Sequence, residues 1–299
     1  MRRALLVVLA LAGCTREPMT RVDAGPDDRV RVATFNVRRF FDPVCDSGAC
    51  EIGDYEGLPS PAYFEERADQ LAAAIRNLDA DVISLQEIEN QACLDALLVR
   101  LADVMPYGHL GEIGGTATVD VAVLSRLPLD KVVTHRTTNP LMLADGTVAM
   151  FSRELLEVHT HATTGVPVIM FAAHFKSKAN DEPARRLAEA QVSARIVPEV
   201  AAAHPGALIV LAGDLNDTPG SPPLDALVED GGLVRLADDL ALSAQATYRF
   251  NGRGEAIDHL LLAPTPAAVR IPKSSRVWRD GSGYGGSDHA ALTSELTTN

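Results

Sequence analysis

The segment ALIVLAGDLND, residues 207–217, has the pattern of a β-strand followed directly by polar residues. Its first part is a continuous apolar run, which is typical of a strand that is buried on both faces. The run then changes to Gly-Asp-Leu-Asn, so a carboxylate and an amide follow a buried strand directly. Because an unpaired buried carboxylate is costly, we expect Asp214 and Asn216 to face a metal ion or hydrogen-bond donors. Gly213 is interpreted as a tight-turn residue.

The same pattern occurs at five other places in the chain. In each, a short apolar segment borders polar residues that are poor strand formers. These bordering residues are Asn36, Gln86-Glu87, His174, Asp258-His259 and Ser287-Asp288-His289. One such residue alone would fit a loop cap as well as an ion ligand. Their recurrence at strand ends favours one site at which all of them converge.

The residue types at these strand ends indicate a hard cation. Carboxylate and amide oxygens, without a cysteine–histidine cluster, favour Mg²⁺ over zinc, with Mn²⁺ or Ca²⁺ as alternatives. Glu87 follows the buried-type strand DVISL closely, and we expect it to be a direct ligand. Asn36 and Asp288 are expected to be further oxygen ligands or supports.

The rest of the chain mixes short strands with occasional helices. Strands are predicted at residues 30–35, 81–85, 119–124, 155–159, 168–173, 207–211, 256–262 and 290–296. Helices are predicted at residues 63–78, 95–104, 181–204 and 222–228. We find no internal repeat and no long linker, so residues 30–299 are expected to form one layered α+β domain.

Taken in chain order, the polar segments resemble the endonuclease/exonuclease/phosphatase superfamily. The matching segments are TFNV with Asn36, LQEIEN with Glu87, HFKSK with His174, GDLND with Asp214 and Asn216, AIDHLLL with Asp258, and GSDHAAL with Asp288 and His289. The resemblance extends from about Val30 to Leu296. It implies the fold of pancreatic deoxyribonuclease, a two-sheet β-sandwich with flanking helices in four layers (α/β/β/α). It also implies a metal-dependent phosphoric ester hydrolase, with its site at one end of the sandwich.

The resemblance further implies a role for each catalytic side chain. His289 would be the base that activates water, and Asp258 would orient its imidazole. We expect this pair to meet if the two terminal strands are neighbours. His174 would donate a hydrogen bond or a proton to the phosphate. Asp214 and Asn216 would position the water and the phosphate.

The other histidines match no role in this family. Structural or surface positions are expected for His109 and His259, and surface positions for His135, His159, His161 and His204.

The substrate is predicted from weaker similarities. The segments ATFNVRRFFD, HFKSK and TYRFNGRGEAIDHLLL resemble bacterial extracellular nucleases, which favours nucleic acid, DNA or RNA, as the substrate. Arg153, Lys176 and Lys178 could contact its phosphates. Two alternatives stay open. One is a phosphomonoesterase or phospholipid phosphodiesterase with the same site, and the other is a non-catalytic lipoprotein with the same fold.

The N-terminus has the pattern of an export signal. Two arginines precede the apolar run Ala4–Ala12, which is shorter than the roughly 20 residues that a membrane span needs. Leu11-Ala12-Gly13-Cys14 resembles a bacterial lipobox, so we predict a signal peptide at residues 1–13 and lipidation of Cys14. Residues 14–29 are interpreted as a flexible tether. These features predict a monomer that is lipid-anchored in the bacterial cell envelope, or secreted if the signal is cut elsewhere.

The net charge of −13 argues against non-specific coating of DNA, which needs a basic face. It does not argue against a nuclease, because a bound metal ion supplies positive charge at the phosphate.

The cysteines are expected to reflect an oxidising compartment. Cys45 and Cys50 flank the turn-like sequence DSGA, and we predict a disulfide between them, with a metal site as the alternative. Cys93 is then an unpaired thiol, expected to be buried.

Overall fold

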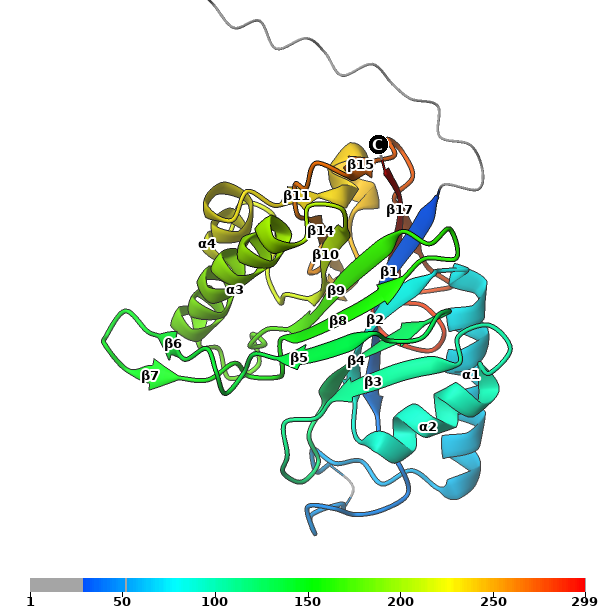
Figure 1. Ribbon diagram of the computed structural model, residues 1–299. Helices are drawn as coiled ribbons and strands as arrows, with labels where there is room; N and C mark the ends of the chain where they lie inside the picture. Colours follow the sequence, from blue (N-terminus) through cyan, green and yellow to red (C-terminus); the bar gives the residue numbers. More distant parts are fainter. Residues whose placement is uncertain (1–28, 52, 299) are drawn as a thin grey trace, which may run out of the picture.

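A computed structural model describes residues 29–51 and 53–298 of the chain, in which two β-sheets pack face to face between helices (Figure 1). This arrangement confirms the predicted α+β sandwich. The predicted signal peptide, Cys14 and all but the last residue of the predicted tether lie outside the described residues. No helix of the described part is long and apolar enough to cross a membrane.

The first sheet has the strand order β15-β17-β1-β2-β4-β3, and β16 also pairs with β17. Its strands are β1 Val30–Phe40, β2 Val82–Ile88, β3 Tyr107–Gly111, β4 Asp120–Ser125, β15 Ala268–Arg270, β16 Arg276–Trp278 and β17 Ala291–Thr298. The central pair, β1 and β2, is parallel, and β1 pairs with β17 in the antiparallel sense.

The second sheet has the order β11-β14-β10-β9-β8-β5. Its strands are β5 Lys131–Thr134, β8 Leu156–His161, β9 Pro167–His174, β10 Leu208–Asp214, β11 Val234–Arg235 and β14 Asp258–Leu262. Two small antiparallel pairs lie outside the main sheets: β6 Leu141–Met142 with β7 Val148–Ala149, and β12 Tyr248–Phe250 with β13 Arg253–Glu255.

The helices cover the outer faces of the sandwich. The first sheet packs against α1 (Pro61–Leu78) and α2 (Gln91–Arg100), and the second packs against α3 (Pro183–Ala203) and α4 (Pro222–Asp225) (Figure 1). A π-helical turn, Ala226–Asp230, extends α4, and two 3₁₀ turns follow at Leu236–Asp239 and Leu242–Ala244.

The helix starts follow from capping side chains. The Ser60 side chain accepts a hydrogen bond from the backbone N–H of Tyr63 at the start of α1. Asn90 does the same for the N–H of Cys93, which is why α2 begins at Gln91 and not at the predicted Asp95.

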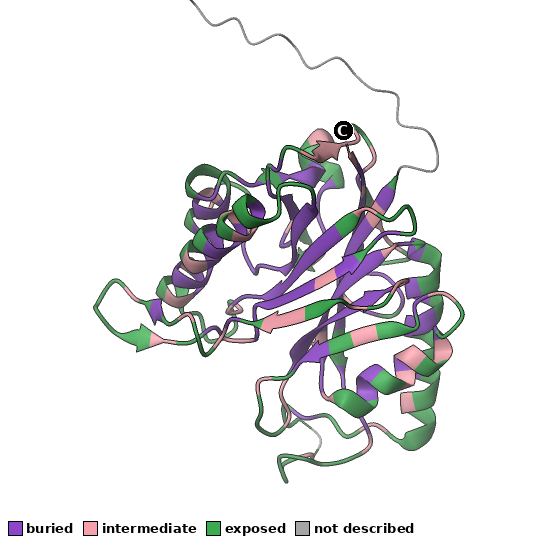
Figure 2. Ribbon diagram, viewed as in Figure 1, coloured by how far each residue is buried: buried purple, intermediate pink, exposed green. Residues whose placement is uncertain are grey.

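The packing of the core explains why β10 is continuously apolar. Along β10, Leu208, Val210 and Ala212 pack between the two sheets, while Ile209 and Leu211 pack toward α3. Successive side chains point to opposite faces of a strand, and here both faces are covered. Figure 2 shows the central strands buried along most of their length.

Gly213 lies inside β10, paired opposite Ala173 of β9, so the predicted turn role is wrong. A Cβ atom at this position would lie 1.9 Å from the Ala173 carbonyl oxygen. The glycine is therefore needed for close approach of the two strands. The change from apolar to polar residues resembled a strand end, but the backbone pairing continues through Asp214.

Candidate active site

Four polar side chains continue the inward-facing rows of their strands. Asn36 on β1, His174 on β9, Asp214 on β10 and Asp258 on β14 are spaced by even intervals from apolar residues packed between the sheets. The period of two therefore points all four into the space between the sheets. Asp214 lies opposite His174 on one side and opposite Asp258 on the other. All four are buried, so the structure brings these predicted site residues together.

Glu87 lies where the first sheet becomes irregular. The register of β2 against β4 shifts between Gln86 and Ile88, and Glu87 has a φ of 68°. A left-handed backbone is costly for a residue with a side chain and is concentrated at functional sites. The Glu87 carboxylate accepts hydrogen bonds from Asn36 Nδ2 at 3.2 Å and from the Arg39 N–H at 2.8 Å.

The carboxylates at this end of the sandwich fit a divalent cation. Asn36 Nδ2 also donates to Asp214 Oδ2 at 3.0 Å, so Glu87 and Asp214 share one donor. Oδ1 of Asp258 is buried and has no hydrogen-bond partner within the described part of the chain. Burial, with the negative charges of Asp258 and Glu87, raises the pKa of Asp214. A cation would relieve this excess of negative charge, and oxygen donors suit Mg²⁺, Mn²⁺ or Ca²⁺.

Asn36 organises these carboxylates through its amide nitrogen. Its oxygen accepts from the Arg38 N–H at 2.9 Å, so the nitrogen, and not the oxygen, faces Glu87 and Asp214. A direct bond from Asn36 to the metal stays a prediction.

Asp288 lies at the edge of the site, with 35% of its side chain exposed and 3.4 Å from Nε of Arg38. Its loop is fastened to the first sheet, because Ser287 Oγ donates to the Asn36 carbonyl at 2.8 Å and accepts from the His289 N–H at 3.0 Å.

His289 and Asp258 form a buried pair. His289 Nδ1 lies 2.9 Å from Asp258 Oδ2, although β14 and β17 belong to opposite sheets and are not neighbours. The pair thus meets, as expected, but across the sandwich and not between neighbouring strands of one sheet. Burial disfavours the charged imidazole, but the negative charge and hydrogen bond of Asp258, with the charges of Asp214 and Asp288, raise the pKa of His289 to about 10. The Tyr248 ring lies 4.8 Å from the imidazole, centroid to centroid.

The pKa of His174 is shifted in the opposite direction from that of His289. Burial, with the positive charges of Arg153 and His289, holds the pKa of His174 well below its usual value, so the ring is neutral. Its Nε2 lies 3.7 Å from Asp214 Oδ2, and its Nδ1 is buried with no hydrogen-bond partner in the described structure.

Asn216 secures the end of β10. It has a φ of 53°, its N–H donates to Asp214 Oδ1 at 2.9 Å, and its Nδ2 donates to the Phe175 carbonyl at 3.0 Å. Asn216 thereby fixes the Asp214 carboxylate.

The predicted substrate-binding residues lie beside the buried groups. Arg153 and Lys176 line a cavity of about 280 Å³. Lys176 Nζ is 3.0 Å from Glu182, and Lys178 Nζ is 3.2 Å from Asp217.

Sequence reasoning missed the residue that holds the loops of Arg153 and Lys176. Glu189 of α3 is fully buried, and its two oxygens accept from the N–H groups of Ser152 and Lys176, each at 2.6 Å. The signal for it is a glutamate on the apolar face of a helix.

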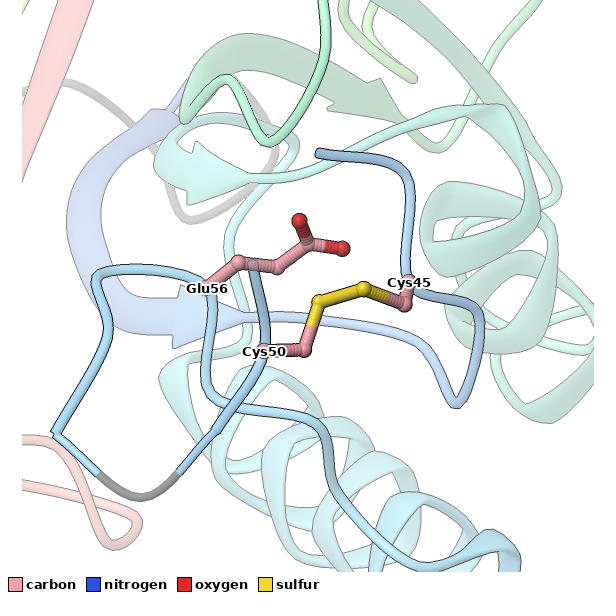
Figure 3. A group of neighbouring side chains, drawn as sticks. All are labelled: Cys45, Cys50 and Glu56. Carbon is pink, nitrogen blue, oxygen red and sulfur yellow. A yellow bond between two sulfur atoms is a disulfide. The ribbon is translucent and has the colours of Figure 1, made fainter. Parts of the chain in front are cut away.

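Cys45 and Cys50 are joined by a disulfide, and Cys93 is a buried free thiol. Figure 3 shows the Glu56 carboxylate beside the disulfide. Glu56 accepts from the N–H groups of Asp46 and Ser47, at 2.6 and 2.8 Å. Because both sulfurs are bonded to each other, this group offers no thiolate to a metal.

Two histidines expected at the surface are instead held by a buried carboxylate. Nε2 of His135 lies 2.8 Å from Glu157, and Nε2 of His159 lies 2.5 Å from the same carboxylate. His259 is buried and contacts the Asp217 carbonyl at 2.9 Å, which agrees with a structural role.

Solved structures share this fold at low sequence identity. A truncated TDP2 from Caenorhabditis elegans is 17% identical, with a TM-score of 0.60 over 90% of this chain and 97% of that one. TDP2 from D. rerio, solved with a single-strand DNA product, is also 17% identical, with a TM-score of 0.60 over 91% of this chain and all of that one. An endonuclease/exonuclease/phosphatase from Bacteroides vulgatus is 16% identical, with a TM-score of 0.62 over 91% and 99%. A comparison with curated proteins gave no match.

The sequence itself matches a family profile. The match covers residues 33–289, which include every candidate catalytic and metal-binding residue described above. The protein is thus a metal-dependent phosphoric ester hydrolase, in agreement with its buried group of Asp214, Asp258 and His289, which could hold a metal ion. The chain belongs to the Endonuclease/Exonuclease/phosphatase family.

Proposed function

We propose that the protein is a nuclease, a phosphodiesterase that hydrolyses DNA or RNA. The observation that carries this proposal is the distribution of positive side chains near Glu87, at the end of the sandwich. Arg38 and Arg39 line one cavity and Arg153 and Lys176 line another, Tyr55 belongs to both, and the Arg39 N–H donates to Glu87. Cations that flank a scissile position suit a polyanion better than an isolated phosphate monoester. The TDP2 structure with a single-strand DNA product supports the same substrate class.

The metal-binding role falls to Glu87 and Asp288, with Asn36 beside them. A bound divalent ion would supply positive charge to the phosphate oxygens as the transition state develops. Mg²⁺ is proposed because the oxygen donors present suit a hard cation.

Proton transfer is proposed for the Asp214–His289 pair. His289 Nε2 lies 3.9 Å from Asp214 Oδ2, so the two groups titrate as a unit and can accept the proton of the attacking water. Asp258 holds the imidazole by its other nitrogen and stabilises the charged form. Neutral His174 would hydrogen-bond to a phosphate oxygen.

The proposed location is the bacterial cell envelope, with a lipid on Cys14. The support for it is the sequence Leu11-Ala12-Gly13-Cys14 after a short apolar run. Metabolic labelling with a fatty acid, comparing the full chain with Cys14→Ser, tests this location independently of the activity.

The nuclease proposal is tested by incubating the purified protein with plasmid DNA or RNA and Mg²⁺, Mn²⁺ or Ca²⁺. Bis-p-nitrophenyl phosphate and p-nitrophenyl phosphate serve as parallel diester and monoester substrates. We expect cleavage of nucleic acid and of the diester. Cleavage of the monoester alone would indicate a phosphatase, and no cleavage at all would favour a non-catalytic protein.

A further inference from the structure

A second cavity, of about 370 Å³, opens next to the candidate active site. Its walls come from the end of β1, the loop at residues 54–59 and the start of α1. They include Arg38, Arg39, Tyr55, Tyr63 and Arg67. Arg38 and Arg39 adjoin the proposed metal-binding carboxylates, whereas Tyr55, Tyr63 and Arg67 have no place in the catalytic chemistry described above.

The cavity presents flat, exposed groups. The Arg39 guanidinium lies 4.5 Å from the centroid of the Tyr55 ring, in a cation–π arrangement. Tyr55 is 49% exposed and Tyr63 is 59% exposed, although aromatic rings are usually buried in a core. Phe41 supports the Tyr55 ring from below, edge to face, with 6.0 Å between centroids.

The cavity is also positively charged. Arg67 is only 8% exposed, and it donates to the carbonyls of Val37 and Gly285 and to the Gln70 side chain. Among the described residues no carboxylate pairs with it. Three arginines, Arg38, Arg39 and Arg67, and one carboxylate, Asp54, line the cavity, and Asp288 lies 3.4 Å from Arg38, so the lining keeps a net positive charge and favours an anion.

The position of Tyr55 is fixed from both sides. Its neighbour Glu56 holds the backbone of the disulfide loop, and Phe41 and the Arg39 guanidinium contact the Tyr55 ring. Tyr55 also lines the cavity that contains Arg153 and Lys176. It thus forms the wall between two cationic cavities, with Glu87 hydrogen-bonded to the Arg39 N–H.

We infer that this cavity is a nucleotide subsite, which binds the phosphate and the unpaired base next to the scissile phosphate of a single strand. This inference rests on the proposed nuclease function and specifies its substrate. The phosphate would lie against Arg38 and Arg67, and the base would stack on Arg39 and the Tyr55 ring. A base inside a duplex has both faces covered by its neighbours, so only an unpaired base can stack here.

The test compares two substrates in the same protein. A short single-stranded oligonucleotide reaches the subsite, whereas bis-p-nitrophenyl phosphate contains only the scissile group. For Tyr55→Ala and Arg39→Gln we expect KM for the oligonucleotide to rise roughly tenfold, as for the loss of one stacked base. As a result, the ratio of kcat/KM for the oligonucleotide to kcat/KM for the diester should fall. Tyr55→Phe keeps the ring and should retain the preference. Tyr107→Ala, which removes an exposed tyrosine outside both cavities, is the matched control.

The outcomes separate the subsite from the proposed function. If the wild type cleaves the diester but no nucleic acid, the nuclease proposal and the subsite are both overturned. If it cleaves the oligonucleotide and both variants keep the wild-type ratio, only the subsite is overturned. Equal losses on the two substrates would also overturn it, because the loop would then merely support the metal site. Thermal melting shows whether Tyr55→Ala folds, and Arg39→Gln, an exposed side chain, gives the answer if it does not.

Discussion

His174, Asp214 and Asp258 lie in register on three regular strands of the second sheet, and all three are buried. The first sheet contributes Glu87 and Arg39 in a different way. Both have a left-handed backbone, with φ of 68° and 41°, and both reach toward solvent. The regular sheet thus places Asp258 and Asp214, the buried carboxylates beside His289, and the irregular sheet end places the groups that would meet metal and substrate.

This difference has a physical reason. Buried ionisable groups must be held by many neighbours, because an error in their hydrogen bonds leaves a charge unpaired. Groups that meet a ligand must leave the plane of the sheet, and a register shift with a positive φ turns Glu87 out of the regular alternation. Changes in the first sheet should therefore alter metal and substrate dependence, and changes in the second sheet should alter folding and pH dependence.

The largest expected effect is on the metal-dependent rate, through Glu87. Glu87→Gln keeps the shape of the side chain and removes its charge, and we expect kcat to fall at least about a hundredfold. The metal concentration needed for half-maximal rate should rise, while the pH profile keeps its shape. Steady-state rates over a Mn²⁺ or Mg²⁺ series would show this, with the exposed Glu229→Gln as control. Unchanged activity at limiting metal would remove Glu87 from the site.

The second prediction concerns the regular sheet. Gly213→Ala places a methyl group against the Ala173 carbonyl, so β9 and β10 must separate. We expect a loss of about 3 kcal/mol in the free energy of unfolding, the upper range for overpacking. Urea denaturation measures it. Gly206→Ala, where a Cβ meets nothing within 4 Å, is the matched control and should be close to neutral. Equal stability of the two variants would contradict the close approach.

The disulfide at the irregular end should contribute less. Its loop is short, so the chain-entropy model predicts a stabilisation of about 2 kcal/mol for the Cys45–Cys50 bond. Denaturation of Cys45→Ser/Cys50→Ser against the wild type measures this value. Mass spectrometry without reduction should find the two residues linked, and free thiols at both, or a link from either to Cys93, would show the assignment to be wrong.

The smallest expected effect concerns the buried Asp258–His289 pair and the pH dependence of the rate. The Asp258 carboxylate raises the pKa of His289, so Asp258→Asn should lower that pKa. The rate rises with pH as the Asp214–His289 pair loses its proton, and the ascending limb should therefore move to lower pH. The maximal rate should fall roughly tenfold, because the imidazolium loses its partner. Rates over a pH series at saturating metal test this, and an unmoved limb would leave His289 without Asp258 as its partner.

Much of the regular sheet could be predicted from the sequence, because the apolar runs of β9 and β10 end in His174 and Asp214, and β14 begins at Asp258. The pairing of these strands could not be predicted, because an apolar run does not indicate which strand lies beside it in the sheet. This is why Gly213 resembles a turn residue in the sequence, and why the sequence does not show that Asp258 and His289 meet across the sandwich.

The irregular parts were harder to predict. Short edge strands such as β3 and β5 have too few residues to show a period. The cavity beside Tyr55 depends on a loop whose course follows from the contacts of Glu56 and Arg39, and composition does not encode such contacts. Tyr55 and Tyr63 lie eight positions apart in the chain, with no aromatic residue between them, but they line the same cavity in the folded protein.

We propose that the end of the sandwich is a metal-dependent phosphodiesterase site. The most direct test is the rate of bis-p-nitrophenyl phosphate hydrolysis by protein stripped with EDTA, before and after Mg²⁺ or Mn²⁺ is restored. We predict that activity is lost with EDTA, that it returns in a saturable way with added metal, and that Glu87→Gln shifts this saturation to higher metal concentration. Full activity of the wild type in EDTA, or identical metal curves for the two proteins, would contradict the account.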